Sequence, residues 1–139
     1  MADRPSANEL IAAVRQHLET VLLPTIEDQR LRFQTLVAAN VLSIVERELE
    51  LDEPHTLAEW TRLDALLADP QPPPSTDAER HAALDARNRE LCARIAAGAF
   101  DAEPQHSALM QHLQRTTMDK LEVANPKFLS RVLGRGPGG

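Results

Sequence analysis

Apolar residues recur at helical spacing along most of the chain, and no run of β-branched residues alternates with polar ones as a half-buried strand requires. The capping-box pattern, in which Ser or Thr is followed by Glu three residues later, marks helix starts. It occurs at Ser6…Glu9, Thr56…Glu59 and Thr76…Glu79. Pro and Gly supply the stops, at Leu23-Pro24, Glu53-Pro54, Gly98 and Asn125-Pro126. We therefore predict an all-α fold, a bundle of about five helices, over residues 7–22, 28–51, 57–68, 77–97 and 105–124.

The second of these helices differs from the others in the width of its apolar face. At roughly 100° per residue, its apolar residues cover about half of the circumference: Phe33, Val37, Val41, Leu42, Ile44, Val45 and Leu49. The last two helices carry narrower stripes: Leu84, Leu91 and Ile95, then Leu109, Met110, Leu113 and Leu121. The second helix is therefore predicted to be the long central helix of the bundle.

The length of 139 residues predicts a single domain, since domains typically take about 100–200 residues. We place this helical domain at 1–133. A proline-rich segment, which favours extended polyproline II, separates a front group of helices from a rear hairpin. The expected parts are front helices 6–68, spacer 69–75, rear hairpin 76–124, a short C-terminal turn 126–133 and a disordered tail 134–139.

Composition and charge exclude several classes of partner. With 15 Lys and Arg against 21 Asp and Glu, the net charge is −6, which disfavours nucleic acid and anionic membrane surfaces. The longest mostly apolar stretch, 36–45, falls short of the roughly 20 residues that span a bilayer. One cysteine allows no internal disulfide and no thiolate metal cage. We expect a cytoplasmic protein that binds neither nucleic acid nor membranes.

Signatures of catalysis are missing from the sequence. It contains none of the common phosphate-binding, hydrolase or zinc-protease patterns. His106 and His112 are six residues apart, which places them on different sides of a helix, so they cannot chelate one metal. Cys92 borders an apolar stripe and is expected to be a small buried hydrophobic residue. We predict no catalytic residue, no metal ligand and no cofactor, and so not an enzyme.

Five polar residues fall within or beside the apolar stripes: Arg30, Asn40, Glu48, Asn88 and Lys120. Buried polar groups need partners, so these side chains should find one another, water or a ligand. In one interpretation Glu48 and Lys120 form an inter-helix ion pair while Asn88 sets the helix register. In the other, Glu48, Asn88 and Lys120 surround an inter-helix pocket with Asn40 at its rim. The second interpretation describes a small ligand-binding module or enzyme.

An acidic patch, Glu46, Glu50, Asp52 and Glu53, lies with Glu48 near the predicted end of the second helix. Negative charge at a helix C-terminus opposes the helix dipole, at a cost of about 0.3–1 kcal/mol per exposed charge. A basic group is therefore expected nearby. The candidates within the chain are Lys120, Lys127 and Arg131, and the alternative is a partner protein that docks on the patch.

Several segments resemble a family of small all-helical bacterial proteins of unknown function. They are Pro5–Ile11, Arg32-Phe33, Val37–Asn40, Val45–Leu49, Asn88–Cys92 and Asp119–Phe128. Members of that family are often encoded beside aminoglycoside-phosphotransferase-like kinases and acyl-CoA dehydrogenases. The resemblance implies an accessory role in acyl-CoA metabolism and supplies no catalytic residues. We expect a non-catalytic accessory protein that binds such a kinase or dehydrogenase, or a homodimer formed through the wide apolar arc of the second helix.

Overall fold

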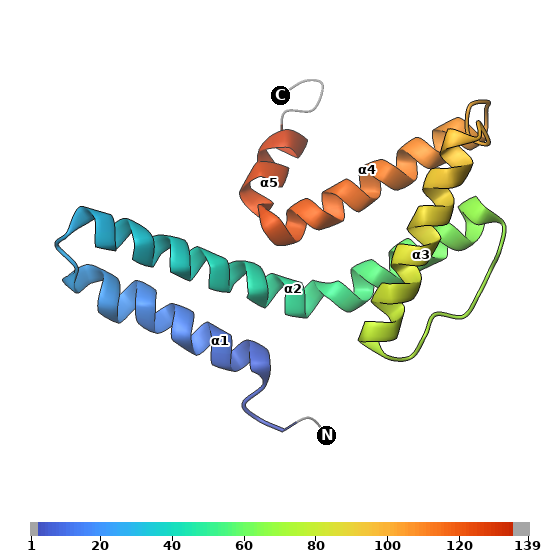
Figure 1. Ribbon diagram of the computed structural model, residues 1–139. Coiled ribbons are helices and arrows are strands. Elements are labelled where there is room, and N and C mark those ends of the chain that lie inside the picture. Colours follow the sequence, from blue (N-terminus) through green and yellow to red (C-terminus); the bar gives the residue numbers. More distant parts are fainter. Residues whose placement is uncertain (1–2, 135–139) are drawn as a thin grey trace. The chain divides into compact units, whose positions relative to one another are not determined.

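A computed structural model describes residues 3–134 and shows an all-α chain (Figure 1). The elements are α1 (Ala7–Gln16), a π-helical turn η1 (His17–Leu22), a 3₁₀ turn η2 (Leu23–Thr25), α2 (Gln29–Leu67), α3 (Asp77–Ala96), α4 (Gln105–Ala124) and α5 (Pro126–Gly134). The predicted all-α class with a long second helix is confirmed, and no strand occurs in residues 3–134. Of the predicted tail, Gly134 ends α5 and 135–139 lie outside the described residues.

The chain divides into two compact units, which we describe separately. Within the described residues, the first unit comprises 3–52 and 122–134, and the second unit comprises 53–121. Helix α2 contributes its first half to the first unit and its second half to the second unit. Among residues 3–134, no helix is long and apolar enough to cross a membrane.

Two of the three predicted capping boxes begin helices. The backbone N–H of Glu9 donates to Ser6 Oγ at 3.2 Å at the start of α1. The N–H of Glu79 donates to Thr76 Oγ1 at 3.3 Å at the start of α3. These bonds satisfy N–H groups that have no partner within the helix.

The predicted break at Glu53-Pro54 is wrong. Helix α2, 39 residues in all, continues through Pro54 to Leu67, and Thr56 lies buried inside it where a helix start was expected. Proline removes one hydrogen bond, to the carbonyl four residues earlier. That carbonyl belongs to Glu50, which is exposed, so water can replace the missing donor. Side-chain packing further along α2 therefore outweighs the local signal.

The first unit is built around a pair of neighbouring helices, α1 and the first half of α2 (Figure 1). Arg15 on α1 forms an ion pair with Glu46 on α2. The Nε of Arg47 donates to the carbonyl of Val123 at 2.7 Å, which ties α2 to the end of α4. Among the described residues of this unit, Ala39 alone falls in the buried class. The first unit therefore has almost no core of its own.

The second unit contains the hydrophobic core of the chain. Its buried members come from α2, α3, α4 and the loop before α4: Trp60, Leu63, Leu67, Leu84, Leu91, Phe100 and Leu109. Leu63 has no exposed surface at all. Leu84 and Leu91 confirm the predicted stripe of α3, and Ile95 packs against its edge.

The buried face of α4 differs from the predicted stripe. Leu109 is buried as expected, but Met110 and Leu113 are 51% and 41% exposed. His112 and Asp119 are buried instead, at 4% and 6%. The helix is rotated because polar partners on α2 bind this row of side chains, as described below.

Cys92 was expected to be buried, and this expectation is wrong, because its side chain is exposed. The adjacent Leu91 faces the core, so Cys92 is turned outward by about 100°, the angle between successive residues of a helix.

Candidate functional site

A row of three arginines follows one side of α3 in the second unit. Arg80, Arg87 and Arg94 are seven residues apart, or about two helical turns, so they lie on one face. Leu84 and Leu91 alternate with them on the same side and enter the core. Arg80 and Arg87 are themselves buried, each 6% exposed. Buried guanidinium groups need hydrogen-bond acceptors, which the neighbouring segment supplies.

The acceptors are backbone carbonyls at the end of α2 and in the proline-rich segment. Arg80 donates to the carbonyls of Pro74 and Ser75, both at 3.2 Å. Arg87 donates to the carbonyl of Asp69 at 2.9 Å, and Arg94 to that of Leu67 at 2.7 Å. Polyproline II structure has no internal hydrogen bonds, so its carbonyls depend on outside donors. The segment predicted as a spacer is therefore fastened along α3 by the arginine row.

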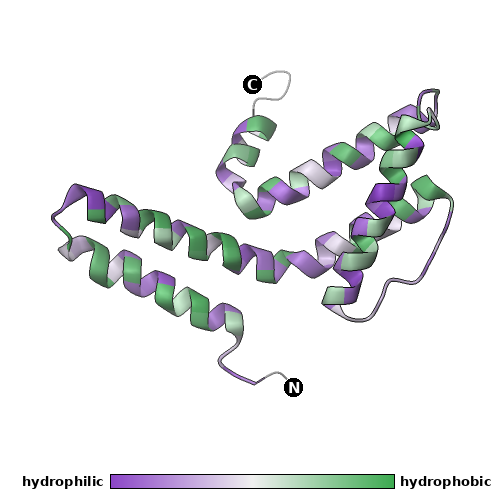
Figure 2. Ribbon diagram, viewed as in Figure 1, coloured by the Kyte–Doolittle hydropathy of each residue, from purple (hydrophilic) through white to green (hydrophobic). Residues whose placement is uncertain are grey.

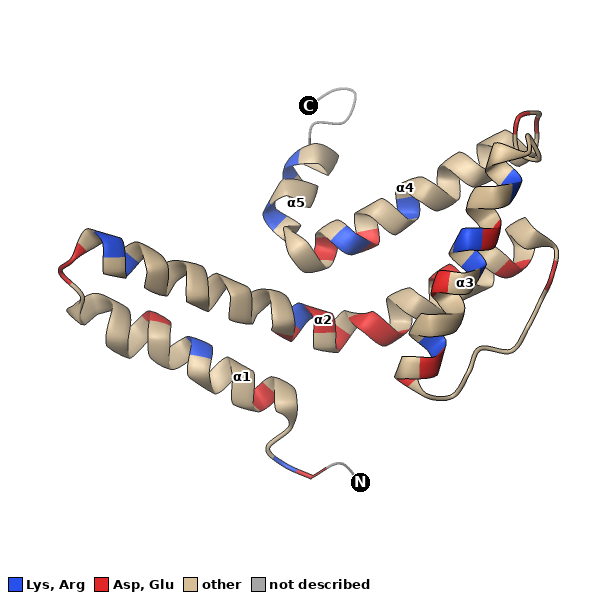
Figure 3. Ribbon diagram, in the orientation of Figure 1, with Lys and Arg blue, Asp and Glu red and all other residues tan. Residues whose placement is uncertain are grey.

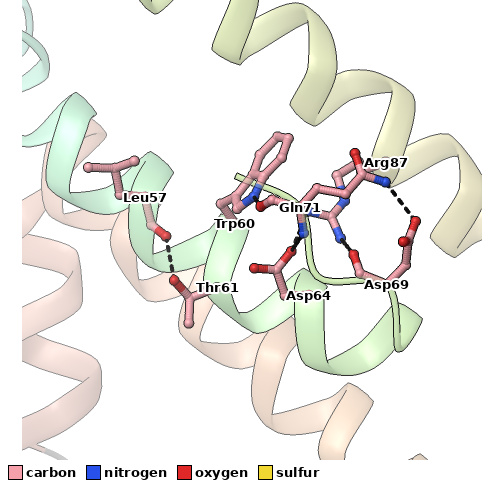
Figure 4. A network of polar contacts seen from close by, with 7 residues as sticks. All are labelled: Leu57, Trp60, Thr61, Asp64, Asp69, Gln71 and Arg87. Carbon is pink, nitrogen blue, oxygen red and sulfur yellow. Dashed lines mark hydrogen bonds and ion pairs between the residues drawn. The ribbon is translucent and has the colours of Figure 1, made fainter. Parts of the chain in front are cut away.

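Arg87 is the centre of a buried network that also includes α2 (Figure 4). Its guanidinium donates to Asp64 Oδ1 at 2.7 Å and lies 4.5 Å from the centre of the Trp60 ring. The indole N–H of Trp60 donates to the carbonyl of Gln71 at 2.7 Å. The Arg87 hydrogen bond is the main reason why the pKa of Asp64 is lowered, and the Gln71 N–H adds to it. The carboxylate therefore stays ionised and paired.

A second polar contact joins α2 to α4. Arg62 donates from Nε to His112 Nδ1 at 3.0 Å and from a terminal nitrogen to Thr116 Oγ1 at 3.1 Å. Burial lowers the pKa of His112, and the charge of Arg62 lowers it further. The imidazole is therefore neutral at pH 7, with Nδ1 as acceptor and its proton on Nε2.

A third contact surrounds the buried Asp119 on α4. His55 Nε2 lies 3.7 Å from Asp119 Oδ1, and Arg115 Nε lies 3.3 Å from the same oxygen. The carboxylate thus has a cation from its own helix beside it. These three clusters give the buried charges of the second unit internal partners, which is the arrangement expected of groups that hold helices together.

The first unit presents the opposite arrangement, because its large apolar side chains face outward. On α2 these form the α2 arc, defined as Phe33, Leu36, Val37 and Val41, which are 67%, 46%, 46% and 51% exposed. Figure 2 shows hydrophobic residues along this half of α2. Ala39 and Glu46, which mark the side that α1 covers, lie about 140–160° around the helix from Val41. The α2 arc is therefore on the side away from α1.

Helix α1 carries exposed apolar residues as well. The α1 row, defined as Leu10, Val14 and Val21, is 53–57% exposed. Monomeric proteins rarely expose apolar patches larger than a few hundred Å² unless they bind something there. The two apolar surfaces of the first unit therefore qualify as candidate docking sites.

Charge borders the α2 arc at both ends but is absent from its middle. Residues 33–45 include no charged side chain, while Arg30 and Arg32 precede them and Glu46 to Glu50 follow, with Arg47 the single base among them. The uncharged stretch is visible as a tan section of α2 (Figure 3). Arg32 donates to the carbonyl of Leu23 at 3.3 Å. The side chains of Arg30 and Glu48 are exposed and make no hydrogen bond or ion pair with the described residues.

The five predicted polar residues fall into two groups. Arg30, Asn40 and Glu48 are exposed on the first half of α2, in the first unit. Asn88 is half-buried on α3 and Lys120 is exposed on α4, both in the second unit. A pocket or an ion pair that joins the two groups stays a prediction. Arg30, Asn40 and Glu48 lie on the same side of α2 as the α2 arc.

The predicted acidic patch is partly neutralised within the chain. Glu46 pairs with Arg15, whose pKa is raised chiefly by this hydrogen bond. Oε1 of Glu53 lies 4.0 Å from Nη1 of Arg80. Neither base belongs to the predicted set of Lys120, Lys127 and Arg131. Glu50 is exposed and Asp52 is half-buried.

Sequence reasoning missed the arginine row, together with Trp60, Arg62 and Asp64. The signal was present as the seven-residue spacing of Arg80, Arg87 and Arg94, in phase with Leu84 and Leu91. It was overlooked because arginine is seldom buried, and its burial here depends on carbonyls from a segment without regular structure.

Fold and surface together define an all-helical protein with one closed unit and one unit whose apolar surface is open. The family model of DUF6285, a domain of unknown function, matches residues 24–128, which is about three quarters of the sequence. The chain belongs to this family, which confirms the resemblance to a family without a known function. No curated protein and no solved structure matches the chain.

Proposed function

We propose that this chain is a non-catalytic interaction protein that docks another protein on the apolar surface of its first unit. The observation that carries the proposal is the open apolar surface of this unit, formed by the α1 row and the α2 arc, whose side chains are 46–67% exposed. Keeping such a surface in water is costly, and burying it on a partner removes that cost.

The polar chemistry of the second unit supports a non-catalytic role. Arg87 with Asp64, and Arg62 with His112, are bonded to one another across helices of the same unit. A general base or a nucleophile needs a polar group directed at a substrate. These groups are directed at each other and at backbone carbonyls.

The gene neighbours implied by the family resemblance give the proposal its partner class. We propose an accessory protein, bacterial and cytoplasmic, that binds a phosphotransferase-like kinase or an acyl-CoA dehydrogenase in acyl-CoA metabolism. The exposed Glu50 would border the docking surface and orient the partner. Neither nucleic acid nor a membrane is required.

Copurification with the neighbouring kinase or dehydrogenase tests the proposal. The full chain is mixed with each purified enzyme at micromolar concentration and examined by size-exclusion chromatography. We expect co-elution, which Val14→Lys abolishes because it places a charge in the α1 row. Ala82→Lys, on an exposed position of α3, is the control and should keep co-elution. Separate elution of the unmodified chain, or binding that Val14→Lys does not weaken, would contradict the proposal.

A further inference from the structure

The α2 arc lies between two exposed residues of opposite charge. Arg30 and Glu48 are 18 positions apart (48 − 30), which is about five helical turns, so both lie on one side of α2. Val37 and Val41 lie between them on the same side, and both are about half exposed. One end of this surface is therefore basic, its middle apolar and its other end acidic, over roughly 27 Å.

We infer that the α2 arc is a self-association face on which α2 of a second copy of this chain packs antiparallel. The inference deepens the proposed function and rests on it, since it names the occupant of one of the two apolar surfaces. In this dimer Arg30 of each copy lies opposite Glu48 of the other. A two-fold axis repeats the pair, as in every isologous interface.

One register satisfies both the charged and the apolar positions. In an antiparallel pair, residues that lie opposite one another have a constant sum of residue numbers. Arg30 and Glu48 sum to 78, and so do Val37 and Val41. Phe33 and Val45 give the same sum. The alignment that pairs the charges therefore also places valine opposite valine, and it brings Phe33 to the level of the half-buried Val45.

The charges select this orientation over the alternatives. A parallel pair in register would place Arg30 beside Arg30 and Glu48 beside Glu48, and like charges in close proximity are unfavourable. An unrelated protein would need a matching basic, apolar and acidic sequence of its own. A second copy of this chain supplies that match without any further requirement.

The position of Asn40 fits the same axis. It lies next to the midpoint between Val37 and Val41 and is exposed. It lies about 80° around the helix from the line through Arg30 and Glu48, so in this register the two amides border the apolar seam on one side. Of the polar residues singled out from the sequence, Arg30 and Glu48 thereby form the ends of the interface and Asn40 borders it.

The available area is sufficient for a moderately stable dimer. The four side chains of the α2 arc are 46–67% exposed, and each offers roughly 60–100 Å². With the aliphatic stems of Arg30 and Glu48, each copy buries on the order of 500 Å², or about 1,000 Å² in total. This value reaches the lower end of specific interfaces, so we expect a dissociation constant in the micromolar range.

Charge reversal tests the register. In sedimentation velocity between about 5 and 200 µM, the unmodified chain should shift from monomer to dimer. Arg30→Glu and Glu48→Arg should each weaken the dimer about tenfold or more, because each places like charges opposite one another twice. The double variant R30E/E48R restores opposite charges at both sites and should recover the original dissociation constant to within about threefold.

Two valine variants test the surface. Val41→Lys should weaken the dimer by about 100-fold or more, since two copies bring two charges into the seam. Val14→Lys is the matched control, because Val14 on the α1 row is equally exposed, 53% against 51%. It should leave the dimer intact. Circular dichroism of each variant verifies that the helices remain folded.

A chain that stays monomeric at about 200 µM overturns the inference. So does a dimer that single charge reversals leave unchanged, or one that the double variant fails to restore. These results are distinct from failure of the proposed function. A monomer that still co-elutes with the neighbouring enzyme removes the self-association face and leaves the docking role standing.

Discussion

The two units of this chain use similar helices to opposite effect. The second unit buries seven large apolar side chains and the guanidinium groups of Arg80 and Arg87. The first unit buries Ala39 among its described residues and exposes most of its leucines, valines and phenylalanines. The two units differ in whether other helices of the same unit cover their apolar side chains.

That difference predicts where stability and binding reside. Apolar side chains contribute to folding only where burial removes them from water. The second unit should therefore account for most of the free energy of unfolding of the isolated chain. The first unit should gain stability when a partner or a second copy covers it, by an amount that grows with the logarithm of the partner concentration divided by its dissociation constant.

The largest expected effect is a difference in the free energy of unfolding between a variant in the core of the second unit and one on the exposed surface of the first unit. Leu63→Ala, at a position with no exposed surface, should lower the free energy of unfolding by about 2–5 kcal/mol because it leaves a cavity. Leu10→Ala, at a position 54% exposed in the first unit, should change it by about 0.5 kcal/mol or less. Urea denaturation followed by circular dichroism measures both. Equal losses at the two positions would mean that the contrast between the units is not energetic.

A smaller effect tests the arginine row. Arg87→Met should cost about 2–4 kcal/mol, since it leaves Asp64 without its cation and the carbonyl of Asp69 without its donor. Arg89→Met, at an exposed position two residues away, is the control and should change stability by about 0.5 kcal/mol or less. Limited proteolysis within 68–76 should accelerate in the first variant alone. Unchanged proteolysis would show that Arg87 does not hold the proline-rich segment.

The smallest effect concerns pH and His112. Its pKa is lowered from the ordinary value of 6.5, first by burial and then by Arg62. Below pH 6.5 the unfolded chain therefore binds more protons than the folded chain, so stability falls as pH decreases. The slope is at most about 1.4 kcal/mol for each pH unit between the unfolded and folded pKa values.

The variant His112→Gln isolates this contribution. Glutamine can still accept from Arg62 but does not titrate. Urea midpoints at about pH 7.5 and about pH 5.5 should differ more for the unmodified chain than for the variant. Equal differences would show that His112 takes up its proton as easily in the folded chain as in the unfolded one.

Local sequence signals located the elements well where they act within one turn. Ser6 and Thr76 cap α1 and α3 because the side-chain oxygen and the N–H that it binds are three residues apart. The same pattern at Thr56 failed, because α2 runs through Pro54 and places Thr56 inside the helix. A local signal decides a helix boundary only when no longer-range packing opposes it.

The sequence by itself determined the all-α class, the wide apolar arc of α2 and the charged residues that border it, since these follow from helical periodicity. Tertiary structure decided which faces are covered. It turned Arg87 and His112 inward, because carbonyls and side chains from distant segments offered them hydrogen bonds, and it left Cys92 and Met110 outside. It also left the arc open on the side away from α1. Periodicity describes one helix at a time, whereas burial depends on which other surfaces reach that helix.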